Sequence, residues 1–268
     1  MPNSAITLSN VYLTYSGKSG PVTALKNVSI HAKTGEFVSI VGPSGCGKST
    51  ILKILSGLIP STAGSVLVNG VHVDGPPPSV GIVFQSAQLM PWRNILDNVL
   101  VQIEMRGLPV AQYRDEARAL LHMAGLSAFE RSFPYQLSGG MQQRVGICRA
   151  LVHAPDLLIM DEPFGALDAM TREQMMVELQ RIWMERKTTV LFITHSLSEA
   201  IFLSDRVIVM SPRPGRVVGE FDIPMPRPRL IRDERSEIFT TLSDQVRSCL
   251  ERSGAIPPEQ TSRVTVQP

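Results

Sequence analysis

The spacing of apolar residues along the chain predicts where its strands and helices lie. Residues 37–41 are almost entirely apolar and lead into a glycine-rich stretch at residues 42–50, as expected of a buried strand that feeds a loop. Residues 28–32 alternate apolar with polar side chains, which predicts a half-buried strand just before it. After the loop, apolar residues recur at helical spacing, at Ile51, Leu52, Ile54, Leu55 and Leu58. We therefore expect strand, glycine-rich loop and helix in succession.

The rest of the chain continues this alternation. The pair Asn69-Gly70 between two runs of alternating residues predicts a hairpin, and residues 88–152 look mainly helical. Three short apolar runs predict further strands, at residues 157–160, 190–193 and 207–210. Strands that alternate with helices indicate an α/β fold. Its sheet is expected to be mostly parallel and covered on both faces, with a smaller antiparallel sheet beside it.

The composition changes near the C-terminus. Residues 223–229 are rich in proline and arginine and should be extended. One amphipathic helix is expected further on, with its apolar face formed by Phe239, Leu242, Val246 and Leu250. Residues 257–268 should be frayed. We therefore divide the chain into a domain at residues 1–215 and a C-terminal extension at residues 216–268.

Composition and charge narrow the class of protein. Apolar residues make up 43% of the chain, and 26 basic and 24 acidic residues leave a net charge of only +2. This balance suits a globular protein and lacks the basic excess of a nucleic-acid binder, so no nucleic-acid partner is expected. The three cysteines show no metal-type spacing, which favours a reduced, cytoplasmic chain. No signal peptide and no apolar run of about 20 residues is evident, so any membrane role should pass through a partner.

The glycine-rich stretch carries the clearest chemistry. It fits the phosphate-loop pattern G-x-x-x-x-G-K-[ST] and comprises Gly42, Pro43, Ser44, Gly45, Cys46, Gly47, Lys48, Ser49 and Thr50. Glycines let backbone N–H groups wrap phosphate oxygens, and the following helix presents its N-terminus to the same anion. Lys48 would reach the β- and γ-phosphates, and the Ser49 hydroxyl would bind Mg²⁺. The alternative, a chance match, is disfavoured by the strand and helix on either side.

Two acids and a histidine follow later strands. Asp161 and Glu162 end the apolar run at 157–160, where carboxylates are costly unless they face a cleft or a metal. Asp161 would hold Mg²⁺ and Glu162 would polarise the attacking water, whereas the alternative is a solvated turn. His195 comes just after another buried strand, the place where open α/β sheets put ligand groups. A satisfied core histidine is the alternative for that residue. For Gln85, also at a strand end, the residues alone do not decide.

A second glycine pair precedes another predicted helix. Ser138, Gly139 and Gly140 would place exposed N–H groups at a helix start, which could form a second anion site. One nucleotide does not need two such sites. Either these residues are a helix cap, or they serve a nucleotide that another molecule holds.

These motifs, in this order, resemble those of the ATPase subunits of ATP-binding cassette (ABC) transporters. The resemblance covers roughly residues 5–215, and the signature at 137–144 is highly specific to that family. It implies a P-loop NTPase (RecA-like) core, an antiparallel β subdomain and an α-helical subdomain inserted at about residues 88–152. It also implies ATP and Mg²⁺ as ligands. Two chains would pair head to tail, as a homodimer or with a similar cassette, so that the phosphate loop of one faces the signature of the other.

The resemblance assigns a role to each matching residue. Tyr15 matches the aromatic residue that stacks on adenine. Gln85 matches the glutamine that senses Mg²⁺ and the attacking water and links the site to the membrane subunit. Glu162 matches the general base, His195 the γ-phosphate switch, and Asp168 the loop that communicates across the dimer.

A finer resemblance points to the nitrate, sulfonate and taurine importer branch. It rests on Phe84-Gln85 with residues 89–93, on 213–216 and on 223–229, although importers of pyrimidine-type vitamin precursors share much of this pattern. It implies a motor that couples ATP hydrolysis to uptake of a small anion or organic solute. The motor would lie on the cytoplasmic face of the inner membrane, bound to integral membrane permease subunits and working with an extracytoplasmic solute-binding protein. One departure is Gly165, where many cassettes have serine, which puts a minor inter-subunit contact in doubt.

Two alternatives are a soluble ABC ATPase of DNA repair or translation, and an exporter motor. Lys48 and Ser138 are only 90 positions apart, which leaves no room for the coiled-coil insert of the repair type. Translation types carry two cassettes, and this chain shows one. Exporter motors are often fused to membrane segments, but separate ones exist.

Two further expectations concern single residues. Because Cys46 lies in the phosphate loop, a bulky thiol adduct there should block the nucleotide. Residues 88–94 should dock the membrane partner, since they follow Gln85 and bring Leu89, Met90 and Trp92 close together on a loop. The alternative for Trp92 is a place in the core of the helical subdomain.

Overall fold

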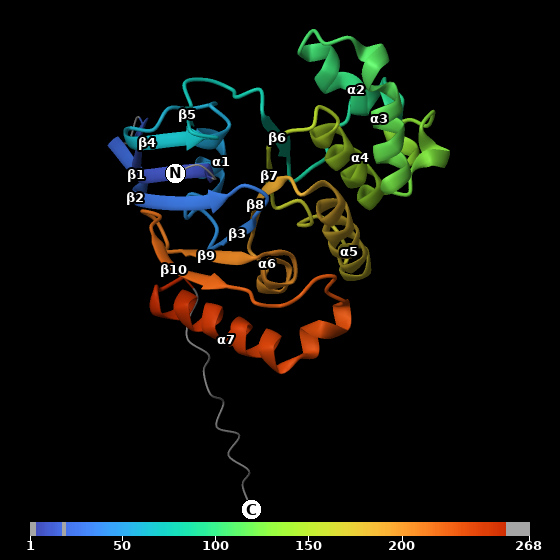
Figure 1. The fold of residues 1–268 in the computed structure, drawn as a ribbon. Coiled ribbons are helices and arrows are strands. Elements are labelled where there is room, and N and C mark those ends of the chain that lie inside the picture. Colours follow the sequence, from blue (N-terminus) through green and yellow to red (C-terminus); the bar gives the residue numbers. More distant parts are fainter. Residues whose placement is uncertain (1–3, 18–19, 256–268) are drawn as a thin grey trace, which may run out of the picture.

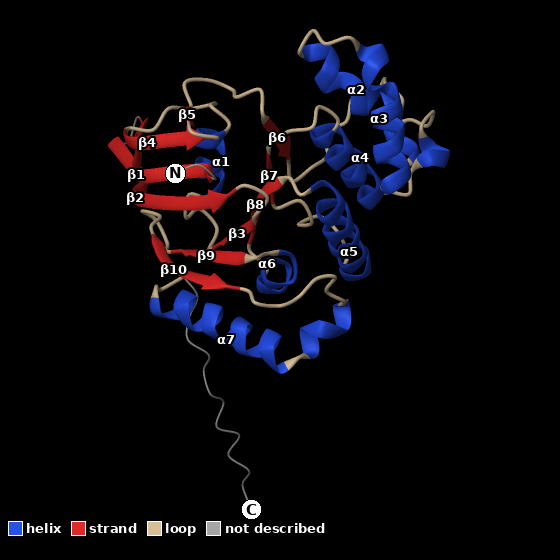
Figure 2. Cartoon of the chain, viewed as in Figure 1, coloured by secondary structure: helices blue, strands red, loops and turns tan. Residues whose placement is uncertain are grey.

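The computed structural model describes residues 4–17 and 20–255 of the chain. Over these residues the strands form a six-stranded and a four-stranded sheet, with helices on both faces of the larger one (Figure 1, Figure 2). The end predicted to fray, residues 257–268, lies outside the described residues. The fold class is therefore α/β, as predicted.

The larger sheet is mostly parallel. Its spatial order is β10 (Val217–Asp222), β9 (Arg206–Met210), β3 (Phe37–Val41), β8 (Thr189–Thr194), β7 (Leu157–Asp161) and β6 (Val80–Val83). Neighbours from β9 to β6 are parallel, and β10 is antiparallel to β9. This sheet is the RecA-like core that the motifs indicated.

Alternate residues of these strands face two separate cores. Along β8, Val190 and Phe192 pack with the helical layer, whereas Leu191 and Ile193 pack toward the smaller sheet. The strands β3, β7 and β9 alternate in the same way. Because both faces are covered, nearly every position is apolar, which explains the continuous apolar runs in the sequence.

The smaller sheet is antiparallel throughout. Its order is β2 (Gly20–Lys33), β1 (Ser4–Gly17), β4 (Ala63–Val68) and β5 (Val71–His72). The β4–β5 hairpin turns at Asn69 and Gly70, whose φ angles of 51° and 76° lie in the left-handed region that such tight turns require. The predicted hairpin and antiparallel subdomain are both present.

The helices form three groups. Helix α1 (Lys48–Leu55) packs between the two sheets, and α5 (Ala169–Arg186), α6 (Leu197–Leu203) and α7 (Glu237–Arg252) belong to the opposite core. A third group stands apart beside β6 (Figure 1) and contains α2 (Ile95–Met105), α3 (Val110–Met123) and α4 (Gly139–Leu151). Short 3-10 turns lie at Ser127–Phe129, Pro134–Gln136 and Ile231–Arg235. None of the helices within the described ranges is long and apolar enough to cross a bilayer.

The C-terminal extension packs on the core of the larger sheet. The division proposed at residue 215 falls between β9 and β10, which are neighbours in one sheet. Helix α7 runs alongside β10 (Figure 1). Its apolar face is buried as predicted, through Phe239, Leu242, Val246 and Leu250. The division at 215 therefore stays a proposal about function, because the packing is continuous across it.

A buried arginine, Arg229, holds this extension against the rest of the fold. Arg229 lies in the segment predicted to be extended, yet it is only 1% exposed. Burial lowers the pKa of Arg229 to about 10, so the guanidinium remains charged at neutral pH. It donates hydrogen bonds of 2.8–3.4 Å to five backbone carbonyls, those of Ile201, Phe202, Ser204, Ile223 and Met225. One side chain thus joins the end of α6 to the extension.

Replacement of Arg229 should destabilise the whole protein. In Arg229→Ala the carbonyls would lose their buried partner, at a cost of about 3 kcal/mol or more. Arg229→Lys should recover little of this, because an ammonium lacks the planar fork. Urea unfolding measures the change, and Arg232→Ala, at an exposed arginine nearby, is the control. Equal stability of the Arg229→Ala and Arg232→Ala variants would contradict this account.

Candidate functional site

The phosphate loop joins β3 to α1 and is shaped by glycine. Gly45 and Gly47 have φ angles of 75° and 108°, which side chains with a Cβ rarely adopt. A Cβ on Gly47 would also lie 2.6 Å from Cδ2 of Leu25. Helix α1 begins directly after Gly47, and its first N–H groups have no partners within the helix. The loop therefore presents a helix N-terminus that suits an anion.

Lys48 supplies the positive charge of this loop. Its Nζ donates to the carbonyls of Gly42 at 2.7 Å and Pro43 at 3.1 Å, which folds the lysine back over the loop. Gly42 and Pro43 thus shape the loop through their backbone oxygens. A charged group held in this way adds to the anion preference of the α1 N-terminus.

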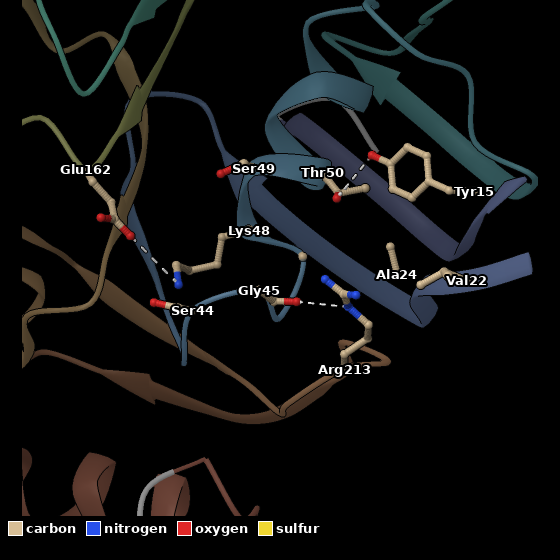
Figure 3. A pocket seen from close by; sticks show the side chains of 11 residues that line it. Tyr15, Val22, Ala24, Ser44, Gly45, Lys48, Ser49, Thr50, Glu162 and Arg213 are labelled. Carbon is tan, nitrogen blue, oxygen red and sulfur yellow. Dashed lines mark hydrogen bonds and ion pairs between the residues drawn. The ribbon is translucent and has the colours of Figure 1, made fainter. Parts of the chain in front are cut away.

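A pocket opens beside the loop (Figure 3). Its walls are Tyr15, Val22, Ala24, Ser44, Gly45, Gly47, Lys48, Ser49, Thr50, Glu162 and Arg213. Tyr15 lies at one end of the pocket, with its hydroxyl 3.4 Å from Oγ1 of Thr50, whereas Lys48 and Glu162 lie at the other (Figure 3). An aromatic ring at one end and a cation at the other suit a ligand that is flat at one end and anionic at the other.

Cys46 does not belong to the wall of this pocket. Its side chain is fully buried in the core between the two sheets. Burial raises the pKa of the Cys46 thiol, which makes the reactive thiolate scarcer. The expectation that a bulky adduct at Cys46 would block the nucleotide stays a prediction, and the buried thiol would have to become accessible before it reacts. The thiol packs toward Gly42, where an added Cβ would lie 2.9 Å from Sγ.

Two acids follow β7 and meet the phosphate loop. The Asp161 carboxylate lies 3.5 Å from Oγ of Ser49, as a shared metal ion would need. Burial raises the pKa of Asp161, and the hydrogen bond from Ser49 opposes that rise. Oε1 of Glu162 lies 4.0 Å from Nζ of Lys48. The acids therefore face the loop, and the alternative of a solvated turn is rejected.

Glu162 also contacts His195. The Nδ1 atom of His195 is 3.2 Å from Oε2 of Glu162. The His195 side chain is 62% exposed, so it is not a satisfied core histidine. Glu162 has a φ of 45°, an uncommon conformation for a residue other than glycine, and such backbone conformations cluster at functional sites. Lys48, Glu162 and His195, which are far apart in the sequence, thus form one chain of contacts.

Gln85 lies near this cluster, outside the pocket wall. It is exposed just after β6, and an added Cβ at Gly165 would lie only 3.2 Å from Nε2 of Gln85. Glycine at position 165 therefore leaves room for the glutamine amide. The role of Gln85 toward a metal stays a prediction.

Ser138, just before the second glycine pair, and Asp168 each cap a helix. Oγ of Ser138 accepts the backbone N–H of Met141 at the start of α4, so Ser138 caps this helix, and a role toward a nucleotide held by another molecule stays a prediction. Asp168 caps α5 and accepts bonds from the N–H and hydroxyl of Thr171, which lower the pKa of the aspartate. Gly140 packs against Thr171, and an added Cβ would lie 2.5 Å from its Cγ2. Gly139 is exposed, and none of Ser138, Gly139, Gly140 and Asp168 lines the pocket of its own chain.

Arg213 is a pocket residue that the sequence alone did not assign. Its Nε donates to the carbonyl of Gly45 at 3.4 Å, which puts a second cation beside the loop (Figure 3). The segment lies tightly against the phosphate loop at Gly215, where an added Cβ would lie 1.9 Å from the carbonyl oxygen of Cys46. In the sequence, residues 213–216 stood out only as a feature shared with the branch that the chain resembles. The contact of Arg213 with a loop residue 168 positions earlier is tertiary, so no sequence pattern contains it.

The side-chain oxygen atoms at this site suit a magnesium ion whose other ligands are phosphate oxygens. No cluster of three or more histidine, cysteine or acidic side chains in the described part of the chain could hold a metal by itself. Ser49 and Asp161 together offer a hydroxyl and a carboxylate. Mg²⁺ is commonly held by one or two such groups with phosphate oxygens and waters completing its shell.

Comparison with known proteins identifies the family. The profile described as ABC transporter matches residues 25–165. The taurine import ATP-binding protein TauB of Ruegeria pomeroyi is 45% identical, over 82% of this chain and 83% of that one. The aliphatic sulfonates import ATP-binding protein SsuB of Bacillus cereus is 37% identical, over 94% and 98%.

A solved structure agrees in fold. It is the dimeric, post-hydrolysis state of an ATP-binding cassette bound to ADP and Pi, and it matches with a TM-score of 0.71 and 35% identity. The match covers 82% of this chain and 100% of that one. The chain therefore belongs to the ATP-binding proteins of the ABC transporter family, and it is an ATPase.

Proposed function

We propose that this ATPase is the motor of an importer for a small organic anion of the taurine or sulfonate type. The observation that carries the proposal is Glu162 in contact with both Lys48 and His195 beside the phosphate pocket. The substrate class is supported by relatives that are named taurine and aliphatic sulfonate import proteins. Sulfonates are charged and cross bilayers poorly, so their uptake needs a transport protein.

ATP is expected to lie along the pocket with its base at Tyr15 and its phosphates on the loop. The Tyr15 ring would stack on adenine, while the N–H groups from Gly45 to Thr50 hold phosphate oxygens. Lys48 would leave its loop carbonyls for the β- and γ-phosphates. Mg²⁺ would neutralise phosphate charge, with Ser49, Asp161 and Gln85 around it.

Hydrolysis is assigned to Glu162. Its carboxylate would accept a proton from the attacking water, and the Lys48 ammonium would stabilise charge on the phosphate being transferred. His195, within hydrogen-bond distance of Glu162, would contact the γ-phosphate and hold the acid in place.

The active unit is proposed to contain two cassettes. Ser138 and Gly139 are exposed at a helix start yet do not line their own chain's pocket. In a head-to-tail pair they would meet the γ-phosphate that the partner holds, with Gly140 packed behind them. Asp168 would lie at the same contact. The solved relative is itself a dimer.

The membrane subunits are proposed to dock at a groove beside Gln85. The groove lies between β6 and α2 and includes Phe84, Met90 and Met105. Trp92 is 72% exposed, which rejects its placement in the helical core. Leu89, in contrast, packs partly against that core, which leaves Trp92 as the exposed member of the predicted cluster. Docking here would put the chain on the cytoplasmic face of the inner membrane, with a solute-binding protein on the opposite side.

The rival functions gain no support from the fold. Between the end of α1 and Ser138 lie β4 to β6, two α-helices of 11 and 14 residues and two 3-10 turns, without the long coiled coil of a repair ATPase. An exporter motor would share the nucleotide site. Uptake that requires an external binding protein would distinguish an importer from an exporter.

Glu162→Gln should bind ATP and hydrolyse it at least about 100-fold more slowly, because an amide cannot accept the proton. Size exclusion should then show a dimer that depends on ATP. Glu185→Gln, at a half-exposed glutamate of α5, is the control and should keep the parent rate. Hydrolysis at the parent rate in the Glu162→Gln variant would show that the base lies elsewhere.

Arg213→Ala should weaken ATP binding by about five-fold, as expected for loss of one exposed cation near phosphate. The loss should shrink at high salt, because salt screens exposed charges. Fluorescent-nucleotide titration measures the dissociation constant. Arg216→Ala removes the same charge from the same loop outside the pocket wall and should change little. Equal effects of both variants would show that Arg213 only adds to the general positive charge near the pocket.

Trp92→Ala should leave melting temperature and ATP binding of the isolated subunit nearly unchanged, because the indole is mostly exposed. It should weaken co-purification with the membrane subunits and abolish uptake. Val71→Ala, at a residue 69% exposed on the smaller sheet, is the matched control. A large fall in the melting temperature of Trp92→Ala, or normal assembly, would count against docking at this residue.

A further inference from the structure

The turn that carries His195 is held by a buried glutamate. Glu199, in the first turn of α6, is only 4% exposed. Its Oε2 accepts a 2.5 Å hydrogen bond from the Thr194 hydroxyl, and Oγ1 of Thr194 accepts the N–H of Ser196 at 3.0 Å. These two bonds involve the residues on either side of His195. The backbone at His195 is therefore fixed through Glu199.

An arginine from another helix completes this arrangement. Nε of Arg172, on α5, lies 3.5 Å from Oε1 of Glu199. Nη2 of the same guanidinium donates to the carbonyl of Leu167 at 3.0 Å, just before Asp168. Burial raises the pKa of Glu199, while the charge of Arg172 opposes the rise. Arg172 thus connects the Glu199 carboxylate to the loop at Asp168.

We propose that Glu199 and Arg172 are a positioning pair that holds His195 against Glu162 and ties it to the Leu167–Asp168 loop. The proposal rests on the proposed function, in which His195 and Glu162 act on the γ-phosphate. Neither member of the pair lines the pocket, so both act through other residues. A shift of the loop, where the partner cassette is expected, would move Arg172 and with it the His195 turn. Hydrolysis would in this way depend on the paired state.

The test separates chemistry from binding. Glu199→Gln should lower kcat for ATP roughly 10- to 100-fold, as expected when a reacting group is misplaced by about 1 Å. KM and the dissociation constant for ATP should stay close to the parent values, because the pocket wall is intact. Arg172→Met should give the same split. Arg172→Lys should recover part of kcat, since the charge is retained.

A matched control removes a similar ion pair elsewhere. Glu36 and Arg206 pair at 2.6 Å, are 12% and 15% exposed, and lie at the opposite end of the larger sheet's parallel strands. Glu36→Gln should lower stability to unfolding while kcat stays unchanged. A purely structural role for Glu199 would make the two glutamine variants behave alike.

The double variant Glu199→Gln, Arg172→Met decides whether the residues act together. A single unit predicts a double variant no slower than either single variant, whereas independent residues predict that the losses multiply. Multiplied losses or a parent-like kcat in Glu199→Gln would overturn the proposal. If Glu199→Gln does not fold, the Arg172→Met and Arg172→Lys variants test the proposal on their own, since Arg172 is half-exposed. Full hydrolysis in Glu162→Gln would reject the proposed role of Glu162 as the base, whatever the pair does.

Discussion

Parallel pairing of β3, β8 and β7 is the constraint on which the rest of this protein depends. Val41 pairs with Thr194, and Ile193 pairs with Asp161, so the carboxyl ends of three strands meet at one edge. The phosphate loop, the two acids and the histidine each begin where one of these strands ends. A change of register by one residue would turn every apolar side chain of a strand to the other core. The two cores therefore fix the position of the reacting groups.

Two buried charges of this protein lie at the ends of α6. Glu199 lies in the first turn of this helix, and the Arg229 guanidinium binds the carbonyls at its end. An acid at the N-terminus and a cation at the C-terminus both complement the helix dipole. The two charges come from different parts of the fold, since Arg229 belongs to the C-terminal extension. The extension thus supports the helix that directly follows His195.

Local patterns in the sequence predicted the elements well, for physical reasons that can be stated. The strands of the larger sheet are apolar throughout because both faces are buried. The Asn69-Gly70 turn and the apolar stripe of α7 likewise depend only on neighbouring residues. Leu89 and Cys46 show where such patterns stop, because both side chains turn toward a core that distant elements build. Sequence spacing places a residue on a loop, but it does not say which way the side chain faces.

The sequence by itself determined the α/β class, the phosphate loop and the order of the nucleotide motifs, because these are encoded in short runs of residues. Only the tertiary structure decided that Glu162 touches both Lys48 and His195, that Arg213 lines the pocket, and that Arg229 is buried. Apart from the bonds that Arg229 makes within its own segment, each of these contacts joins residues more than 20 positions apart. Such pairs are set by sheet register and by the packing of separate elements, so no local pattern contains them.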